Sequence, residues 1–340
     1  MIDTPTPLIP SHLPREHPLI TREYAVFTCA IDDMVTSVAG WLDDQMDGAI
    51  IYGPSRYGKS CAVDHWLQRL LSERHGGFVP MVIWSHVDSG GAQSVGRFHA
   101  HLLSAAQHPL AHAHRTPAAR LHMLIERLTS LAMEGGGRFV VLVIDEAQGM
   151  SQREWLWLVQ LHSQLEKEQV RLCVISIASV QFFDEPLGLA LAGGAHAAAR
   201  FMLASAPFHG VRDEDELGLV LDGYDLALQW PADSGISYTE VLAPQAWAAG
   251  SRMHQLAPCL MQALQAELPA GYSGPTDYPM KTITQVCRHV LLRLAAGARP
   301  EDVGREAVLR EIVAASGHRL LMSLVAALGQ RQRGVRRSAT

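Results

Sequence analysis

Two kinds of hydrophobic pattern alternate along the first two thirds of the chain. Short blocks of consecutive apolar residues are typical of strands buried on both faces, and apolar residues three and four positions apart are typical of amphipathic helices. Because helical blocks separate the short ones, the pattern predicts an α/β fold with a five-stranded parallel sheet sandwiched by helices. The predicted strands lie near residues 49–52, 78–87, 139–144, 171–178 and 201–208.

The pattern changes after residue 210, where an acidic run and a loop rich in Pro, Gly and Ser lead into blocks that are mostly helical. The first residues hold several prolines and little periodicity, which indicates an extended segment. We therefore expect four parts: an extended N-terminal arm over 1–21, an α/β domain over 22–210, a C-terminal helical lid domain over 211–329, and a basic tail over 330–340.

The first predicted strand runs directly into a glycine-rich segment with a known spacing. The segment is Gly53-Pro54-Ser55-Arg56-Tyr57-Gly58-Lys59-Ser60, and it matches the phosphate-loop pattern G-x-x-x-x-G-K-[ST] at every specified position. In such a loop, backbone N–H groups and the start of the next helix face an anion. All eight residues are candidates for nucleotide binding, with Lys59 on the β- and γ-phosphates and Ser60 on Mg²⁺.

The third predicted strand ends in two adjacent carboxylates, Asp145 and Glu146. The carboxyl ends of parallel strands line the ligand crevice, so this Walker B pattern should lie beside the phosphate loop. We expect Asp145 to hold Mg²⁺ through water and Glu146 to polarise the water that attacks ATP. The next strand ends near Ser179, which we expect to sense the γ-phosphate. Ser176 is the alternative, and a serine that only caps the strand turn fits equally well.

Composition narrows the class of protein. The chain has 340 residues, of which 48% are hydrophobic and 18% charged, enough to bury a full core. It has no asparagine, which excludes the Asn-Lys-x-Asp motif of GTPases and favours ATP. Five cysteines without a C-x-x-C pair suggest neither a disulfide framework nor a cysteine zinc site. No apolar stretch is long enough for a membrane span, so we expect a cytoplasmic protein.

Neither the net charge nor the histidine content determines whether the protein binds nucleic acid or a metal ion. The net charge of −6 argues mildly against a basic coat, although a local basic stripe can still bind nucleic acid. Six histidines between residues 99 and 122 make a metal site conceivable. Because they have no carboxylate or cysteine at ligand spacing, exposed helix and turn histidines are the favoured interpretation.

The order of these parts resembles an AAA+ ATPase: phosphate loop, Asp-Glu strand end, polar strand end, Arg200 just before the fifth strand, and a Gly-x-Arg ending at Arg319 in the helical region. More narrowly, the phosphate loop, the 144–148 segment, Arg200 with Phe201, and the 208–210 segment are similar to the TnsC/TniB family. Those proteins are ATP-dependent regulators of Mu-like and CRISPR-associated DNA transposition. The resemblance covers roughly residues 22–328.

The resemblance implies roles for residues outside the two motifs. Arg200 would be an arginine finger that reaches the nucleotide of a neighbouring subunit, and Arg319 would contact the phosphates of its own. Family members assemble on duplex DNA as helical filaments or rings, with about six or seven subunits per turn or ring. Arg97, Arg115 and Arg120 lie in the region whose basic residues line the bore, although plain solvated arginines fit equally well.

The resemblance also implies partners, a transposase and a target-selector protein, and it leaves two other functions open. One is an AAA+ clamp or helicase loader, and the other is a scaffold in which ATP orders a surface with little hydrolysis. Two departures from the family pattern bear on this choice. Tyr57 is bulky where the loop usually has a small residue, and the chain lacks a sensor asparagine, which is compatible with slow hydrolysis.

Overall fold

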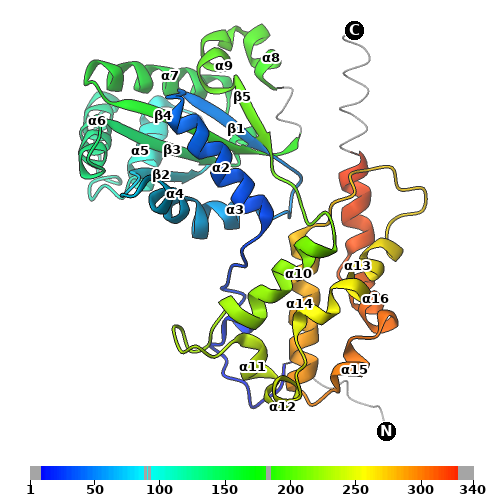
Figure 1. The fold of residues 1–340 in the computed structure, drawn as a ribbon. Coiled ribbons are helices and arrows are strands. Elements are labelled where there is room, and N and C mark those ends of the chain that lie inside the picture. Colours follow the sequence, from blue (N-terminus) through cyan, green and yellow to red (C-terminus); the bar gives the residue numbers. More distant parts are fainter. Residues whose placement is uncertain (1–8, 88–89, 91–92, 181–184, 328–340) are drawn as a thin grey trace. The chain divides into compact units, whose positions relative to one another are not determined.

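The computed structural model describes residues 9–87, 90, 93–180 and 185–327 (Figure 1). Their contacts divide the chain into two compact units. The first, which we call the α/β unit, consists of residues 31–55 and 59–208. The second, which we call the helical unit, consists of residues up to 30, residues 56–58 and the chain from residue 209 onward. None of the described helices is long and apolar enough to cross a membrane.

The α/β unit is built on a five-stranded parallel sheet with the strand order β2-β3-β4-β1-β5. This confirms the predicted fold class. The strands are β1 Gly48–Tyr52, β2 Met81–Ser85, β3 Phe139–Asp145, β4 Arg171–Ala178 and β5 Ala204–Pro207.

The register of the sheet brings functional candidates to one edge. Ser85 at the end of β2 lies opposite Asp145 at the end of β3, and Tyr52 at the end of β1 lies opposite Ala178 at the end of β4. The carboxyl ends of four strands therefore meet at the edge where the phosphate loop begins.

Helices cover both faces of this sheet, because successive side chains of the central strands are buried on alternate sides. Ile50, Leu142 and Val174 face one large cluster, and their neighbours Ile51, Val143 and Ile175 are equally buried on the opposite face. Figure 1 shows α2 and the α3–α4 run on one face and α5 to α7 on the other. The elements are α2 Cys29–Asp43, α3 Lys59–Ala62, η1 Val63–Leu67, α4 Gln68–His75, α5 Val95–Ala105, α6 Pro117–Glu134, η2 Ala147–Gly149, α7 Gln152–Lys167, α8 Glu185–Leu189, η4 Ala190–Gly194 and α9 Ala195–Phe201.

Side-chain caps fix where the long helices begin. Ser94 and Thr116 accept hydrogen bonds from backbone N–H groups in the first turns of α5 and α6. Ser151 and Glu154 form a reciprocal capping box at the start of α7. The α9 helix continues to Phe201, so β5 is shorter than the predicted strand over 201–208. Phe201 is fully buried against helix α7, and this packing overrides its strand propensity.

The helical unit has its own hydrophobic core. Its N-terminal segment is part of that core, since Leu19 is fully buried there where the sequence suggested an extended arm. The basic tail over 330–340 lies outside the described residues. The elements of this unit are α1 Pro18–Thr21, α10 Glu214–Asp222, η5 Gly223–Ala227, α11 Tyr238–Leu242, α12 Pro244–Ala248, η6 Met253–Leu256, α13 Ala257–Ala266, α14 Met280–Ala295, α15 Pro300–Val303 and α16 Glu306–Ala315.

Candidate nucleotide-binding site

The phosphate loop starts at the carboxyl edge of the sheet. The Gly53 N–H donates to the carbonyl of Ala178 at 3.2 Å, which fixes the loop against the end of β4. A side chain at Gly53 would place its Cβ 2.3 Å from the carbonyl oxygen of Phe208, so only glycine fits this approach. Lys59 Nζ donates to the carbonyls of Gly53 and Pro54 at 2.8 Å each. The loop thus curls around the ammonium group.

The electrostatic environment of Lys59 favours an anion. Burial lowers the pKa of its ammonium group to about 8, and the carboxylates of Glu146 and Asp145 oppose this shift only in part. These two carboxylates are the second motif found in the sequence. The fold therefore brings both motifs together, as the sequence predicts. A phosphate group here would supply the charge that stabilises protonated Lys59.

The tip of the phosphate loop, residues 56–58, contacts residues of the helical unit. Residues 56–58 group with the helical unit, where Tyr57 is fully buried and its hydroxyl donates to the carbonyl of Asp277 at 3.2 Å. The Lys281 N–H donates to the carbonyl of Arg56 at 3.2 Å. Gly58 adopts a φ of 107°, which only glycine adopts without strain. The bulky Tyr57 side chain, unexpected at this position of the loop, is thus fully buried.

The Asp-Glu pair ends β3 in a tight turn. Asp145 is 7% exposed, and its Oδ1 accepts a hydrogen bond from the Glu146 N–H at 3.0 Å. Glu146 itself lies in the left-handed region, with φ 58° and ψ 37°. Such a conformation is uncommon for a residue with a side chain and costs on the order of 1 kcal/mol or more. The turn bends the chain directly after the buried Asp145, and the Glu146 side chain is exposed.

Gln148 connects the candidate catalytic residues, although the sequence analysis gave it no role. Its Nε2 donates to Glu146 Oε2, and its Oε1 accepts a hydrogen bond from the Ser179 N–H at 3.0 Å. The ends of β3 and β4 are therefore joined through one side chain. Ser176, the alternative sensor, is fully buried in β4, and its Oγ finds no hydrogen-bond partner in the described part of the chain.

The donor set at this edge fits a magnesium ion bound together with a nucleotide. Ser60 supplies a hydroxyl oxygen at the start of α3, and Asp145 supplies carboxylate oxygens, the ligand type that Mg²⁺ prefers. Within the described ranges, no three or more His, Cys, Asp or Glu side chains form a group that could hold a metal by themselves. The substrate phosphates would complete the coordination, as is usual for Mg²⁺.

Arg200 lies at the end of α9 and is tied to helix α7. Its Nη1 donates to His162 Nδ1 at 3.0 Å and to Ser163 Oγ at 3.1 Å, and it lies 3.6 Å from Glu166 Oε2. The structure thus places Arg200 away from the Asp-Glu turn of its own chain. Nothing in the sequence pattern indicated these three partners.

Arg319 belongs to the helical unit, where it forms an ion pair. Its Nη2 lies 2.8 Å from Glu267 Oε2, and Arg310 lies 3.3 Å from the other carboxylate oxygen. The Glu267 side chain is mostly buried, whereas 63% of the Arg319 side chain is exposed. One carboxylate therefore holds two arginines at the surface of this unit.

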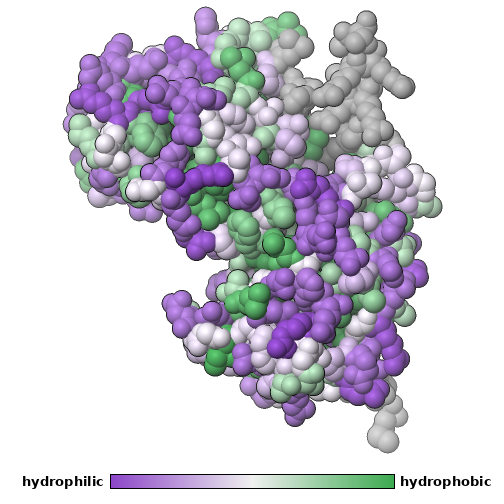
Figure 2. All heavy atoms as spheres, in the orientation of Figure 1, coloured by the Kyte–Doolittle hydropathy of each residue, from purple (hydrophilic) through white to green (hydrophobic). Residues whose placement is uncertain are grey.

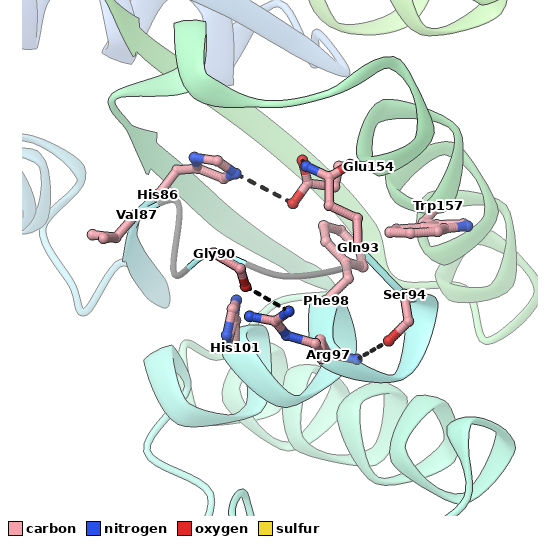
Figure 3. Close-up of a pocket in the computed structure, with 10 residues that line it drawn as sticks. All are labelled: His86, Val87, Gly90, Gln93, Ser94, Arg97, Phe98, His101, Glu154 and Trp157. Atoms are coloured by element: carbon pink, nitrogen blue, oxygen red, sulfur yellow. Dashed lines mark hydrogen bonds and ion pairs between the residues drawn. The ribbon is translucent and has the colours of Figure 1, made fainter.

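The three arginines expected at DNA differ in their surroundings. Arg97 lies in a pocket beside the buried pair His86 and Glu154, and its Nη1 donates to the carbonyl of Gly90 at 2.9 Å (Figure 3). Arg120 donates to the carbonyls of Gly96 and Ala113, which joins α6 to the preceding segments. Arg115 is exposed, and its Nη1 donates to the neighbouring carbonyl of His114 at 3.4 Å. Arg97 and Arg120 thus stabilise the local fold.

Comparisons with known proteins agree with this architecture. Residues 45–183 match the family model described as an AAA domain. The chain is similar to the ORC2 protein of Aeropyrum pernix in its ADPNP and ADP complexes, with a TM-score of 0.54 and 12% identity over 89% of this chain and 72% of that one. It is also similar to the ORC1 protein of Aeropyrum pernix in complex with DNA, with a TM-score of 0.48 and 16% identity over 91% and 67%. No curated protein matches the sequence.

At such low identity, the likeness to ORC2 shows the fold alone. The family model, however, spans the phosphate loop, both carboxylates of the β3 end and the end of β4. The sequence motifs and the strand order agree with it. This chain therefore contains an AAA domain, and its α/β unit has the AAA+ fold.

Proposed function

We propose that this protein is an ATP-hydrolysing AAA+ protein that assembles with copies of itself on duplex DNA and regulates DNA transposition. In this role it links a target-selection factor to the transposase. The observation that carries the proposal is the position of Arg200 relative to the phosphate loop within the α/β unit. It supports an active site that two copies complete together.

The distance between Arg200 and the phosphate loop follows from the parallel sheet. Arg200 is bonded to His162, which lies 3.3 Å from Asp47, the residue directly before β1. The phosphate loop follows the last residue of β1. This strand has five residues, so its two ends lie roughly 15 Å apart at ~3.3 Å per residue. Arg200 therefore lies toward the edge opposite the phosphate loop of its own chain. This position supports a role for Arg200 at the nucleotide of another copy.

The chain's own residues would divide the chemistry of hydrolysis between them. Lys59 and the loop N–H groups hold the phosphates, and Ser60 and Asp145 hold Mg²⁺, which neutralises charge on the phosphate oxygens. Glu146 orients the attacking water and accepts its proton. Arg200 of a neighbouring copy stabilises the charge that develops on the γ-phosphate. Ser179 and Arg319 remain candidates for sensing the nucleotide.

The surface around α9 supports contact with another copy. Leu191 and Leu203, which lie before and after this helix in the chain, are 82% and 76% exposed. Figure 2 colours the visible surface of the molecule by hydropathy, from hydrophilic in purple to hydrophobic in green. Exposed leucines near Arg200 are expected if this surface contacts another copy of the chain.

The DNA-binding part of the proposal rests on the TnsC/TniB resemblance and on charge. A chain with a net charge of −6 has no bulk attraction for DNA, so binding would require arginines from many copies arranged along one surface. Arg115 is the most accessible candidate, with Arg97 and Arg120 beside it in sequence. Assembly would thus precede tight DNA binding.

A titration of labelled random-sequence duplex tests the proposal. Protein is added with ATP, ADP or a non-hydrolysable analogue at several salt concentrations. We expect cooperative binding with ATP and the analogue, weak binding with ADP, and a slope of about −0.9 per neutralised phosphate in log–log terms. Failure to bind DNA with any nucleotide at low salt would refute the transposition role and would leave a loader or a scaffold. The rate of phosphate release then separates these two, because a scaffold binds ATP without turnover.

A further inference from the structure

Arg200 is held by a buried histidine that the phosphate-binding motifs do not involve. The His162 side chain is 1% exposed, and it lies between two charged residues from distant parts of the sequence. Its Nδ1 is 3.0 Å from Arg200 Nη1, and its Nε2 is 3.3 Å from Asp47 Oδ1. The three side chains form a row from Asp47 through His162 to Arg200.

Hydrogen-bond chemistry gives this row a direction. A guanidinium group can only donate, so His162 Nδ1 must present its lone pair to Arg200. With Nδ1 as the acceptor, a ring hydrogen lies on Nε2, which is 3.3 Å from Asp47 Oδ1 but is not aligned for a hydrogen bond with any residue that the structure describes. Glu166 Oε2 also lies 3.5 Å from His162 Nδ1 and 3.6 Å from Arg200 Nη1, so carboxylates flank the ring on both sides. Burial of the ring and these contacts at both of its nitrogens hold His162 next to Arg200.

Packing holds the row in place. Phe201, the residue after Arg200, contacts the His162 ring edge-on at a centroid distance of 5.5 Å. A Cβ at Gly48 would lie 3.0 Å from the Phe201 Cα and 2.6 Å from the Val174 carbonyl oxygen, so α9 packs directly on the start of β1. Because Asp47 adjoins Gly48, the same close contact fixes Asp47 near α9. Three elements therefore set the position of the Arg200 guanidinium.

Only one side of the guanidinium is used in this arrangement. The contacts to His162, Ser163 and Glu166 all involve Nη1. Among the residues that the structure describes, Nη2 and Nε of Arg200 have no hydrogen-bond partner, and the side chain is 33% exposed. One nitrogen thus anchors the group, and the other two can donate to a phosphate.

We propose that Asp47 and His162 are positioning residues for Arg200 and present its guanidinium to the nucleotide of a neighbouring copy. This inference rests on the proposed function, in which Arg200 acts in trans. A free arginine side chain loses rotamer entropy when it is fixed in one orientation. Because its contacts already hold Arg200 in one orientation, less entropy is lost when the transition state forms. We therefore expect these contacts to raise kcat more than they change the Kd for ATP.

Two substitutions at His162 separate positioning from simple packing. His162→Leu keeps a buried side chain but removes the acceptor for Arg200. His162→Gln keeps an oxygen that can accept from Arg200 and an amide that can donate to Asp47. Each is compared with wild type, with Arg200→Ala, and with His99→Leu, in which another buried histidine of the α/β unit is removed.

Steady-state ATP hydrolysis and the Kd for a fluorescent ATP analogue are measured for each protein, with thermal unfolding as a check of folding. We expect His162→Leu to lower kcat about tenfold or more, which corresponds to about 1.4 kcal/mol, while Kd and KM stay within about twofold. His162→Gln should recover most of the lost kcat, and His99→Leu should have a kcat near that of wild type. Mixing His162→Leu with Lys59→Ala subunits, whose Arg200 is intact, should restore turnover.

The outcomes distinguish the inference from the function on which it rests. If Arg200→Ala lowers kcat but His162→Leu does not, the positioning role is overturned and the role of Arg200 stands. It is equally overturned if His162→Gln is as slow as His162→Leu, or if Lys59→Ala subunits rescue Arg200→Ala but not His162→Leu. If Arg200→Ala itself turns over ATP at the wild-type rate, the proposed in-trans site is wrong.

Discussion

The lowered pKa of Lys59 predicts a specific pH dependence of ATP binding. In the free protein, burial lowers this pKa to about 8, so the ammonium group loses its proton in a range where most lysines keep it. Bound phosphates place negative charge beside Lys59 and raise its pKa again. Because the bound state holds the proton more tightly, ATP binding takes up a proton above pH 8. Affinity must then fall as pH rises through the pKa of the free protein.

The magnitude follows from the fraction of charged Lys59. With a pKa of about 8, ~90% of the free protein carries the charge at pH 7 and ~10% at pH 9. The Kd for ATP should therefore rise about tenfold between these pH values, or about 1.4 kcal/mol in binding free energy. Proton uptake should be about half a proton per ATP at pH 8 and close to one at pH 9.

Isothermal titration calorimetry measures both quantities. Kd is determined from pH 7 to 9 with ATP and Mg²⁺, in two buffers of different ionisation enthalpy at each pH, which gives the number of protons taken up. Lys59→Arg is the matched control, since its guanidinium stays charged throughout and should remove the pH dependence. A wild-type Kd that is constant from pH 7 to 9 would refute the reasoning about Lys59.

Two further substitutions test neighbouring parts of the site. Glu146→Gln should keep the Kd for ATP within about threefold of wild type but reduce turnover by two orders of magnitude or more, because the amide cannot accept a proton from water; normal phosphate release would move this role to another residue. Tyr57→Phe should lower the free energy of unfolding by about 1 kcal/mol, because the hydrogen bond to the carbonyl of Asp277 is lost. Tyr57→Ala should lower it by about 3–5 kcal/mol, because removal of the fully buried ring leaves a cavity. Urea denaturation measures both changes. Equal stabilities of these two variants would contradict the packing described for Tyr57.

The fold and the phosphate site could be predicted from sequence because their signals are local. Apolar blocks such as the one ending at Ile144 mark buried strands wherever they occur, and the spacing from Gly53 to Ser60 is a pattern of consecutive residues. Asp145 and Lys59 were expected close together because parallel strands end at one edge, and the structure bears this out. The boundary between α9 and β5 was missed because burial of Phe201 against α7 depends on tertiary packing.

The partners of the arginines could not be predicted, and the reason is physical. Arg97 and Arg120 donate to backbone carbonyls. Because every residue has a backbone carbonyl, residue types in the sequence do not indicate which one accepts the hydrogen bond. Arg200 meets His162 and Asp47 only because β1, α7 and α9 come together in the folded unit. Gln148 lies two residues from Glu146, but its hydrogen bond to Ser179 depends on the pairing of β3 with β4.

The central claim is that two copies of the chain complete each active site, and one mixing experiment tests it most directly. Arg200→Ala and Lys59→Ala proteins are each expected to be inactive, the first because its neighbour lacks the arginine and the second because it does not bind ATP. When they are combined over a range of ratios, a Lys59→Ala copy can supply Arg200 to the nucleotide bound by an Arg200→Ala copy. We expect ATP hydrolysis to reappear in the mixture and to be highest near equal amounts. The absence of activity at every ratio, with both variants folded and still able to associate, would contradict the account.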